Sequence, residues 1–292
     1  ARRCEWSNPR MTIAEAKREL INRFHAVGID SPEVDAEWFL STLIDRSRAE
    51  LPIYQSQTLT THQESLLAEQ VVRRTNREPL QHILGTANFF GYDFEVSPEV
   101  LIPRPETEQL VEWAFRKTKN FLEPVIYDLG TGSGCIAINL AKRLPGTTVI
   151  ASDVSEAALR LAKRNAARLG VEINVQFRQA DGLALTTEEQ VHLLVSNPPY
   201  IPTGEILELQ TEVLEFDPKL ALDGGVDGLV FHRELAALGQ ALLLPGGALL
   251  AEFGDGQESA IEKLFYDARW PSVDFANDLS GKPRIVIASK GL

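Results

Sequence analysis

The sequence has few cysteines, a single methionine and no long apolar stretch. Cys4 and Cys135 are far apart, so they give neither a disulfide framework nor the ligand spacing of a metal site. No uninterrupted apolar run approaches the roughly 20 residues of a membrane span, and the N-terminal region lacks the apolar core of a secretion signal. These absences argue against a disulfide-rich secreted domain and a membrane protein, and we expect a cytoplasmic enzyme.

Basic residues are also scarce. Lys and Arg number 29 against 41 Asp and Glu, which gives a formal net charge of -12 at pH 7. Broad binding to nucleic acid relies on a dense Lys/Arg footprint, so this balance favours a protein or small-molecule substrate and no direct nucleic-acid partner. Arg73, Arg74 and Arg77 form the only tight basic cluster inside a predicted element, and a solvated helix face explains them equally well. The five histidines show no metal spacing, so no metal is predicted.

The N-terminal third of the chain has the pattern of a helical domain. Residues 1–11 show no periodicity and are interpreted as a tail or leader. Capping patterns at Thr12, Ser31 and Thr61, each followed by apolar residues at helical spacing, predict a small all-helical domain over residues 12–79. This domain contains no catalytic constellation, so we expect it to recognise the substrate. The second helix is expected to bury one face, formed by Val34, Trp38, Phe39 and Leu43.

The remainder of the chain has the pattern of a hairpin followed by an α/β domain. Residues 80–105 contain β-like runs at Phe89–Phe94 and at Val100–Pro105, which predict a β-hairpin linker. Over residues 106–292 strands alternate with helices, which predicts a doubly wound, mostly parallel sheet. Its strands are expected at residues 125–129, 148–151, 175–178, 193–195, 248–252, 273–275 and 284–288.

A glycine-rich loop follows the first of these strands. Asp128 ends the strand, and Gly130, Gly132 and Gly134 permit a tight turn and a close backbone approach at the start of a helix. The third glycine comes two residues after the second, which is the spacing of methyltransferases and differs from the dinucleotide pattern. Each glycine could also simply shape a turn.

The next two strand ends carry acidic groups. Asp153 ends the second strand, where a carboxylate can accept both hydroxyls of a ribose. The third strand ends at Asp181 and Gly182, where an adenine ring would lie. Capping and turn roles explain these residues singly, but their joint order fits a nucleoside cofactor without a pyrophosphate.

The segment Ser196-Asn197-Pro198-Pro199-Tyr200 closes a fourth buried strand. Two consecutive prolines make it a stiff loop at the edge of the sheet where open α/β sheets bind ligands. Asn197 offers a side-chain carbonyl and Pro198 a main-chain carbonyl, two acceptors that suit both hydrogens of an NH2 group, and Tyr200 offers a flat face. An amide or an exocyclic amine of a base fits equally well at this stage. A plain turn is the simpler interpretation of the motif in isolation.

With these motifs in place, the chain resembles the class I S-adenosylmethionine-dependent methyltransferases, and among them the release-factor glutamine N5-methyltransferases, also called the HemK or PrmC family. The resemblance extends over nearly everything from Met11 onward. It rests on the helical N-terminal domain and on the segments Leu101–Glu108, Asp128–Gly134, Asn197–Tyr200, Asp217–Leu222, Gly224–Leu229 and Glu252–Gly254.

The resemblance implies a seven-stranded methyltransferase sheet and methyl transfer from S-adenosylmethionine, which leaves as S-adenosylhomocysteine. The acceptor would be the side-chain amide nitrogen of the glutamine in the Gly-Gly-Gln motif of peptide-chain release factors, and the enzyme is expected to be a monomer. Asn197, Pro198 and Tyr200 would be catalytic and, with Pro199, would bind the glutamine. The cofactor would be bound by Gly130, Thr131, Gly132, Ser133, Gly134, Asp153, Asp181, Gly182 and Asn197. The family often carries an aromatic residue where Gly182 stands, and Phe89 or Phe90 is the candidate to replace it.

Two other functions compete with this interpretation. A nucleic-acid methyltransferase acting on adenine N6 or guanine N2 would suit the Asn-Pro-Pro-Tyr loop, but it should carry a basic recognition surface. A scaffold that binds the cofactor without catalysis is the second, and motifs at four successive strand ends argue against it.

Overall fold

The computed structural model describes residues 11–182, 190–278 and 280–291 of the 292-residue chain. The chain forms two compact units. Unit 1 consists of Ala1–Gly85 together with Thr211–Phe216, and unit 2 consists of Thr86–Gln210 and Asp217–Leu292.

Unit 1 consists of helices around a single apolar core that includes Leu20, Phe24, Phe39 and Leu67. Capping boxes start two of its α-helices, at Thr12 as expected and at Thr60, one residue earlier than predicted. The helices are α1 (Ile13–Ala26), α2 (Pro32–Leu43), η1 (Arg48–Glu50), α3 (Leu51–Tyr54), α4 (Thr61–Thr75), α5 (Leu80–Leu84) and α9 (Thr211–Phe216).

The predicted tail of residues 1–11 is wrong at its last residue. Met11 is buried in the core of unit 1, and its backbone N–H donates a hydrogen bond to Glu64 Oε1 (3.0 Å). Residues 1–10 lie outside the described residues.

The face that α2 buries also differs from the prediction. Phe39 is fully buried, but Val34 and Trp38 are more than a third exposed. Asp35 takes an inward position instead, where it accepts a hydrogen bond from Arg74 Nε on α4 (2.6 Å). An apolar-periodicity argument misses this face because a buried ion pair between two helices replaces part of the apolar contact.

The predicted basic cluster is paired with acidic side chains, and only Arg73 of its three arginines lies on a solvated face. Arg74 is 7% exposed and pairs with Glu212 of α9 (3.1 Å) as well as with Asp35. Arg77 pairs with the other oxygen of Glu212 (2.6 Å), and Arg73 pairs with Glu78. Glu212 thereby ties a distant segment of the sequence to unit 1, and none of these three arginines offers an unpaired charge to phosphate groups.

Unit 2 begins with a two-stranded hairpin, β1 (Thr86–Phe89) and β2 (Tyr92–Glu95). The side-chain amide of Asn165 fixes this hairpin, since it accepts from the Glu95 N–H (2.8 Å) and donates to the Glu95 carbonyl (3.0 Å). The second β-like run, Val100–Pro105, forms no strand and was wrongly predicted. Two prolines in this run lack the N–H donors that a strand pairing needs.

The large sheet of unit 2 has seven strands in the order β5-β4-β3-β6-β7-β9-β8, as expected for the predicted methyltransferase fold. The first five strands of this order run parallel, and β9 runs antiparallel to both of its neighbours, β7 and β8. The strands are β3 (Val125–Leu129), β4 (Thr148–Asp153), β5 (Val175–Gln179), β6 (Val191–Ser196), β7 (Leu243–Glu252), β8 (Ser272–Asn277) and β9 (Pro283–Ser289).

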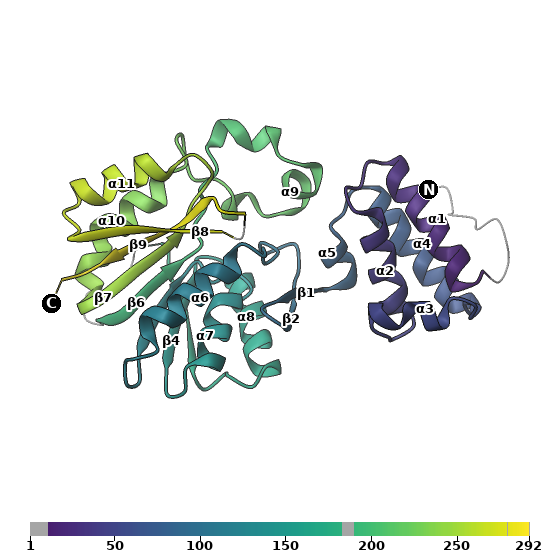
Figure 1. Cartoon of the computed structure of the whole chain (residues 1–292), viewed down its shortest axis with the longest axis horizontal. Helices are drawn as coiled ribbons and strands as arrows, with labels where there is room; N and C mark the ends of the chain where they lie inside the picture. The colour runs from purple at the N-terminus through teal and green to yellow at the C-terminus, as the bar shows by residue number, and fades with distance from the viewer. Residues whose placement is uncertain (1–10, 183–189, 279, 292) are drawn as a thin grey trace. The chain divides into compact units, whose positions relative to one another are not determined.

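Helices cover both faces of this sheet, and alternate residues of each strand point to opposite faces. Ile126 of β3 joins the core under α6 and α7, whereas its neighbour Tyr127 joins the core under α10 and α11. Figure 1 shows α6, α7 and α8 on one side of the strands and α10 and α11 on the other. The helical elements are α6 (Thr107–Thr118), α7 (Cys135–Arg143), α8 (Glu156–Arg168), η2 (Thr203–Glu208), η3 (Lys219–Ala221), α10 (Val230–Leu242) and α11 (Glu258–Asp267).

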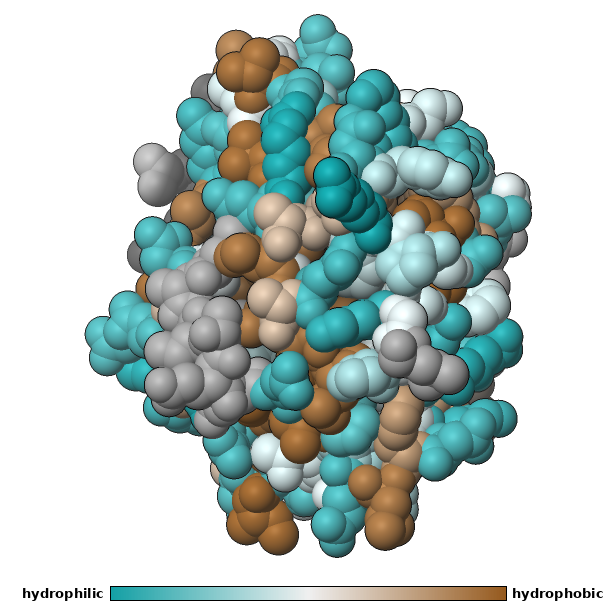
Figure 2. Space-filling view, turned by 90° about the vertical axis from the view of Figure 1, so that its left-hand side faces the viewer, coloured by the Kyte–Doolittle hydropathy of each residue, from teal (hydrophilic) through white to brown (hydrophobic). Residues whose placement is uncertain are grey.

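The surface carries mixed polarity. On the face drawn in Figure 2, hydrophilic residues are interleaved with hydrophobic ones. Within the described ranges, none of the helices combines the length and the apolar character that crossing a bilayer requires.

The loop after β6 is held by a close backbone approach. Gly228 has a φ of +73°, and a Cβ at this position would lie 2.3 Å from the Tyr200 carbonyl oxygen and 2.5 Å from Gln257 Nε2. Gln257 Nε2 in turn donates to the Tyr200 carbonyl (2.8 Å). Only glycine fits this position, so the Gly224–Leu229 segment fixes the far end of the Asn-Pro-Pro-Tyr loop.

We expect Gly228→Ala to lower the free energy of unfolding by about 3 kcal/mol, because it adds an overpacked methyl group to the cost of a positive φ. Gly256→Ala is the matched control. Gly256 has a similar φ of +79°, but no atom lies within 4 Å of its Cβ position, so the cost should be about 1 kcal/mol. Urea unfolding of both variants measures the difference, and equal losses would contradict the packing argument.

Candidate active site

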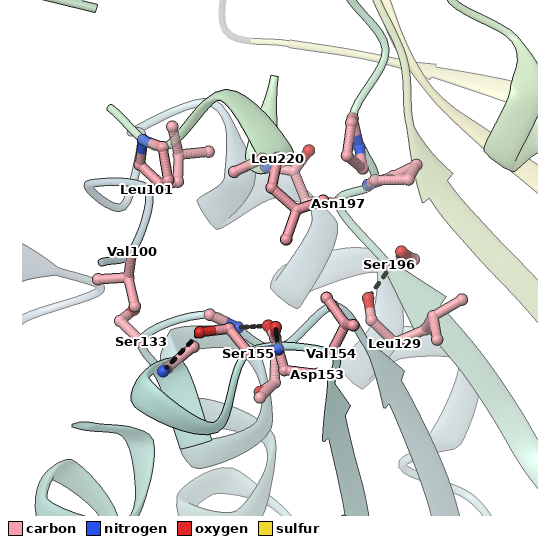
Figure 3. A pocket seen from close by; sticks show the side chains of 18 of the residues that line it. Val100, Leu101, Leu129, Ser133, Asp153, Val154, Ser155, Ser196, Asn197 and Leu220 are labelled. Carbon is pink, nitrogen blue, oxygen red and sulfur yellow. Dashed lines mark hydrogen bonds between the residues drawn. The ribbon is translucent and has the colours of Figure 1, made fainter. Parts of the chain in front are cut away.

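A cavity of about 410 Å³ lies in unit 2, beyond the carboxyl ends of the parallel strands. The ends of β3, β4 and β6 contribute Leu129, Asp153 and Ser196 to its wall. In Figure 3, Asn197 and Leu220 lie across this cavity from Asp153 and Val154. This position is the usual ligand-binding edge of an open α/β sheet.

The glycine-rich loop after β3 forms one wall. Gly130, Thr131, Gly132 and Ser133 line the cavity. Gly134 does not line it and instead caps α7 with a φ of +82°, where a Cβ would lie 2.9 Å from Ile138 Cδ1. The sequence predicted that all five residues of this loop bind the cofactor, and four of the five face the cavity.

Asp128 and Thr131 hold this loop on the strand end. The Thr131 hydroxyl donates to Asp128 Oδ2 (2.6 Å), and the Thr131 N–H donates to the Ser152 carbonyl of β4 (2.8 Å). Burial raises the pKa of the Asp128 carboxyl to about 7, and the Thr131 hydroxyl opposes this shift. Asp128 is therefore a buried support of the loop and is not among the residues that line the cavity.

Asp153 lines the cavity and also braces the glycine loop. Its Oδ2 accepts from the Gly132 N–H (2.9 Å), and its Oδ1 accepts from the Ser155 N–H (2.9 Å). Each carboxylate oxygen has two lone pairs, so both retain the capacity to accept a further hydrogen bond from a ligand hydroxyl.

Asp181 and Gly182 lie at the end of the cavity nearest α10. Both line it, and a Cβ on Gly182 would lie 3.9 Å from Glu234 Oε2 of α10. One turn earlier on α10, Phe231 is the only aromatic side chain among the described residues that line the cavity.

Phe89 and Phe90 do not line the cavity. Phe89 is buried against Phe94, with ring centroids 6.1 Å apart, and Phe90 packs against the Arg143 guanidinium (4.6 Å). The prediction that one of them replaces an aromatic at Gly182 is therefore wrong in this geometry. Phe231 was missed because nothing in the local sequence distinguishes it from a packing residue of an amphipathic helix.

The Asn-Pro-Pro-Tyr loop forms the opposite wall. Asn197, Pro198 and Pro199 line the cavity, whereas Tyr200 is not among its lining residues. The Tyr200 hydroxyl donates to Glu252 Oε1 (3.2 Å), and burial, followed by the nearby Glu252 charge, raises the pKa of this phenol. Tyr200 therefore lies behind the loop, beside a buried carboxylate.

A third wall comes from the irregular segment before α6. Val100, Leu101, Pro103 and Arg104 of this segment line the cavity, as does Thr107, the first residue of α6. Arg104 is the one basic side chain among the described lining residues, and it pairs with the buried Asp217 (2.5 Å), which precedes the lining residues Pro218, Leu220 and Ala221.

Thr107 and Glu252 were not singled out from the sequence. They lie in Leu101–Glu108 and Glu252–Gly254, which entered only as parts of a resemblance. Sequence order gives no sign that these residues, 145 positions apart, share a hydrogen bond of 2.7 Å. Across the described part of the chain, no cluster of three or more His, Cys, Asp or Glu residues is arranged to hold a metal ion.

Comparisons with known proteins show which domains the chain contains. Residues 15–85 match the PrmC N-terminal domain, and residues 108–242 match the methyltransferase small domain. The crystal structure of a Thermus thermophilus 16S rRNA N2 G1207 methyltransferase in complex with AdoMet and guanosine has a TM-score of 0.51 and 18% identity. It covers 70% of this chain and 49% of that chain, and at this identity it shows the fold alone.

Curated relatives cover almost the whole chain. The release factor glutamine methyltransferase of Geobacter sulfurreducens is 39% identical over 89% of this chain and 90% of its own length. The protein of the same name from Koribacter versatilis is 38% identical over 96% of this chain and 99% of its own length. This degree of identity over both domains shows that the chain belongs to the release factor glutamine methyltransferase family.

Proposed function

We propose that this protein transfers the methyl group of S-adenosylmethionine to the side-chain amide N5 of the glutamine in the Gly-Gly-Gln motif of peptide-chain release factors, and that it acts as a monomer. The observation that carries the proposal is that one cavity is lined both by the glycine loop with Asp153 and by Asn197 with Pro198. Under this proposal, the site for the methyl donor and the site for the accepting NH2 group share one space.

The residues on the cofactor side of the cavity fit a nucleoside cofactor that carries no phosphate. Gly130–Ser133 offer a close backbone approach, Asp153 suits two ribose hydroxyls, and the single lining arginine is already paired with Asp217. Asp181 and Gly182 would border the adenine, Phe231 would supply a flat apolar face, and Asn197 would lie beside the reacting end. When bound, S-adenosylmethionine supplies an electrophilic methyl group on a sulfonium.

The Asn-Pro-Pro-Tyr loop would hold the glutamine amide. Asn197 Oδ1 and the Pro198 carbonyl can each accept one N–H of the substrate, and Pro199 would pack beside it. An amide nitrogen is a weak nucleophile because its lone pair is delocalised, so orientation of this nitrogen toward the methyl group is the main contribution. The two acceptors also stabilise positive charge that develops on the nitrogen. Tyr200 would support the loop from behind through Glu252.

A nucleic-acid methyltransferase is expected to carry an unpaired basic surface, and the predicted basic cluster does not provide one. The only basic cluster predicted from the sequence, Arg73, Arg74 and Arg77, is paired with Glu78, Asp35 and Glu212. Binding phosphates there would require breaking these pairs, one of which is buried. A protein substrate is consistent with the acidic balance of the chain.

Incubation with S-adenosylmethionine and an unmodified bacterial release factor should add one methyl group to the Gly-Gly-Gln glutamine, as read by peptide mass spectrometry. Asn197→Ala should lower kcat by about 10²- to 10³-fold, because it removes an oriented acceptor at the reacting nitrogen. DNA and ribosomal RNA fragments serve as competing acceptors. Methylation of a nucleic acid in place of the release factor would overturn the proposal.

Phe231→Leu should weaken binding of S-adenosylhomocysteine about 10-fold, because a flat ring beside adenine is replaced by a smaller aliphatic side chain. Phe90→Leu is the matched control, since Phe90 does not line the cavity, and its affinity should equal that of the wild type. Isothermal titration calorimetry measures both variants. An equal loss in the two would assign the effect to general destabilisation.

A further inference from the structure

Three segments that are far apart in the sequence meet in one hydrogen-bond network at the wall of the cavity. Asn197 Nδ2 donates to Thr107 Oγ1 (3.1 Å), and the Thr107 hydroxyl donates to Glu252 Oε2 (2.7 Å). Tyr200 of the same loop donates to Glu252 Oε1 (3.2 Å). Thr107 and Glu252 are each 2% exposed, so the bond between them is shielded from water.

The network has a defined direction when Glu252 is ionised. An ionised carboxylate only accepts hydrogen bonds, so both hydroxyls must donate to it. Thr107 has a single hydroxyl proton, and this proton is directed at Glu252. Its oxygen can then only accept from Asn197, which requires the NH2 end of that amide to face Thr107 and the Oδ1 end to face away from it.

We propose that Thr107 and Glu252 are positioning residues that hold the Asn197 side-chain amide in the one orientation in which its Oδ1 accepts a hydrogen bond from the substrate NH2 group. The inference rests on the proposed function and adds to it the residues that set the polarity of the acceptor site. With the amide reversed, Asn197 would present an NH2 group to another NH2 group, and no hydrogen bond would form.

One contact fixes the backbone of Glu252, and burial sets the pH range in which its carboxyl group is only an acceptor. Glu252 is the last residue of β7, and its backbone carbonyl lies within hydrogen-bond distance of Nε2 of the buried His232 on α10 (2.9 Å). Burial raises the pKa of the Glu252 carboxyl to about 7, with a smaller contribution from Glu106, while Thr107, Tyr200 and Arg284 oppose this shift. Above that pH the carboxylate is ionised, so the Thr107 and Glu252 variants should be measured above pH 7.

The kinetic constants of two Thr107 variants distinguish a positioning role from a purely structural one. Thr107→Val keeps the shape but removes the acceptor for Asn197, whereas Thr107→Ser keeps the hydroxyl. We expect Thr107→Val to lower kcat for the release factor about 10- to 100-fold with little change in KM, because most contacts of a protein substrate lie elsewhere. Thr107→Ser should retain kcat within about twofold of wild type. Thermal melting and affinity for S-adenosylhomocysteine report on folding and should be similar in the two variants.

A double-mutant cycle tests whether Thr107 and Glu252 act together. Glu252→Met removes the acceptor of the Thr107 proton and frees that hydroxyl to donate to Asn197 Oδ1, so it should also lower kcat. Combining it with Thr107→Val should cost no more than the larger single effect, because both changes release the same amide. Full additivity of the two losses would contradict a shared role.

Nuclear magnetic resonance tests the network without reference to activity. In the full chain labelled with 15N-asparagine, the side-chain NH2 signals of Asn197 are assigned by their disappearance in Asn197→Ala. Their hydrogen exchange should be slow in the wild type and in Thr107→Ser, and fast in Thr107→Val. Rapid exchange in the wild type, or slow exchange in Thr107→Val, would overturn the inference.

The two proposals fail in different ways. A wild-type protein that does not methylate the release factor, but shows the expected exchange pattern, would contradict the proposed function and retain the network. A wild-type protein that methylates the release factor, with Thr107→Val equally active, would retain the function and eliminate the positioning role.

Discussion

The register of β3 between its two parallel neighbours is the constraint on which the site depends. Leu129, the last residue of β3, pairs with Ser152 of β4 on one side and with Ser196 of β6 on the other. The Ser196 hydroxyl donates to the Leu129 carbonyl (2.8 Å), which fixes the start of the Asn-Pro-Pro-Tyr loop against the start of the glycine loop. A shift of one residue in either pairing would turn the alternate side chains of that strand to the opposite face.

Hydrogen bonds between side chains and loops fix the parts of the site that the strand register alone does not place. Asp153 accepts from the glycine loop, Asn165 holds the hairpin, and the bonds from Thr107 and Tyr200 to Glu252 support the Asn197 loop. Each bond joins segments that the sheet alone would leave independent. A buried polar group without a partner costs about 1–3 kcal/mol, so such bonds select one arrangement of loops over others of similar apolar burial.

The sequence predicted those elements whose signals are local. The strand Val125–Leu129 and the helix Cys135–Arg143 were predicted at the bounds the structure has, because a short apolar run and the glycine loop after it are read over a few positions. Predictions were wrong where a distant partner changes the outcome. Val34 and Trp38 face outward because Asp35 pairs with Arg74, 39 residues away. Arg74 and Arg77 are both paired with the distant Glu212.

The sequence by itself determined the fold class, the strand-end motifs and the family, since each of these is carried by residue types at short spacing. Only the tertiary structure decided which motif residues face the cavity. It placed Tyr200 behind its loop, put Phe231 and neither Phe89 nor Phe90 in the cavity wall, and brought Thr107 to Glu252 beneath Asn197. The physical reason is that a hydrogen bond between segments 145 residues apart depends on strand register and helix packing, which no local pattern encodes.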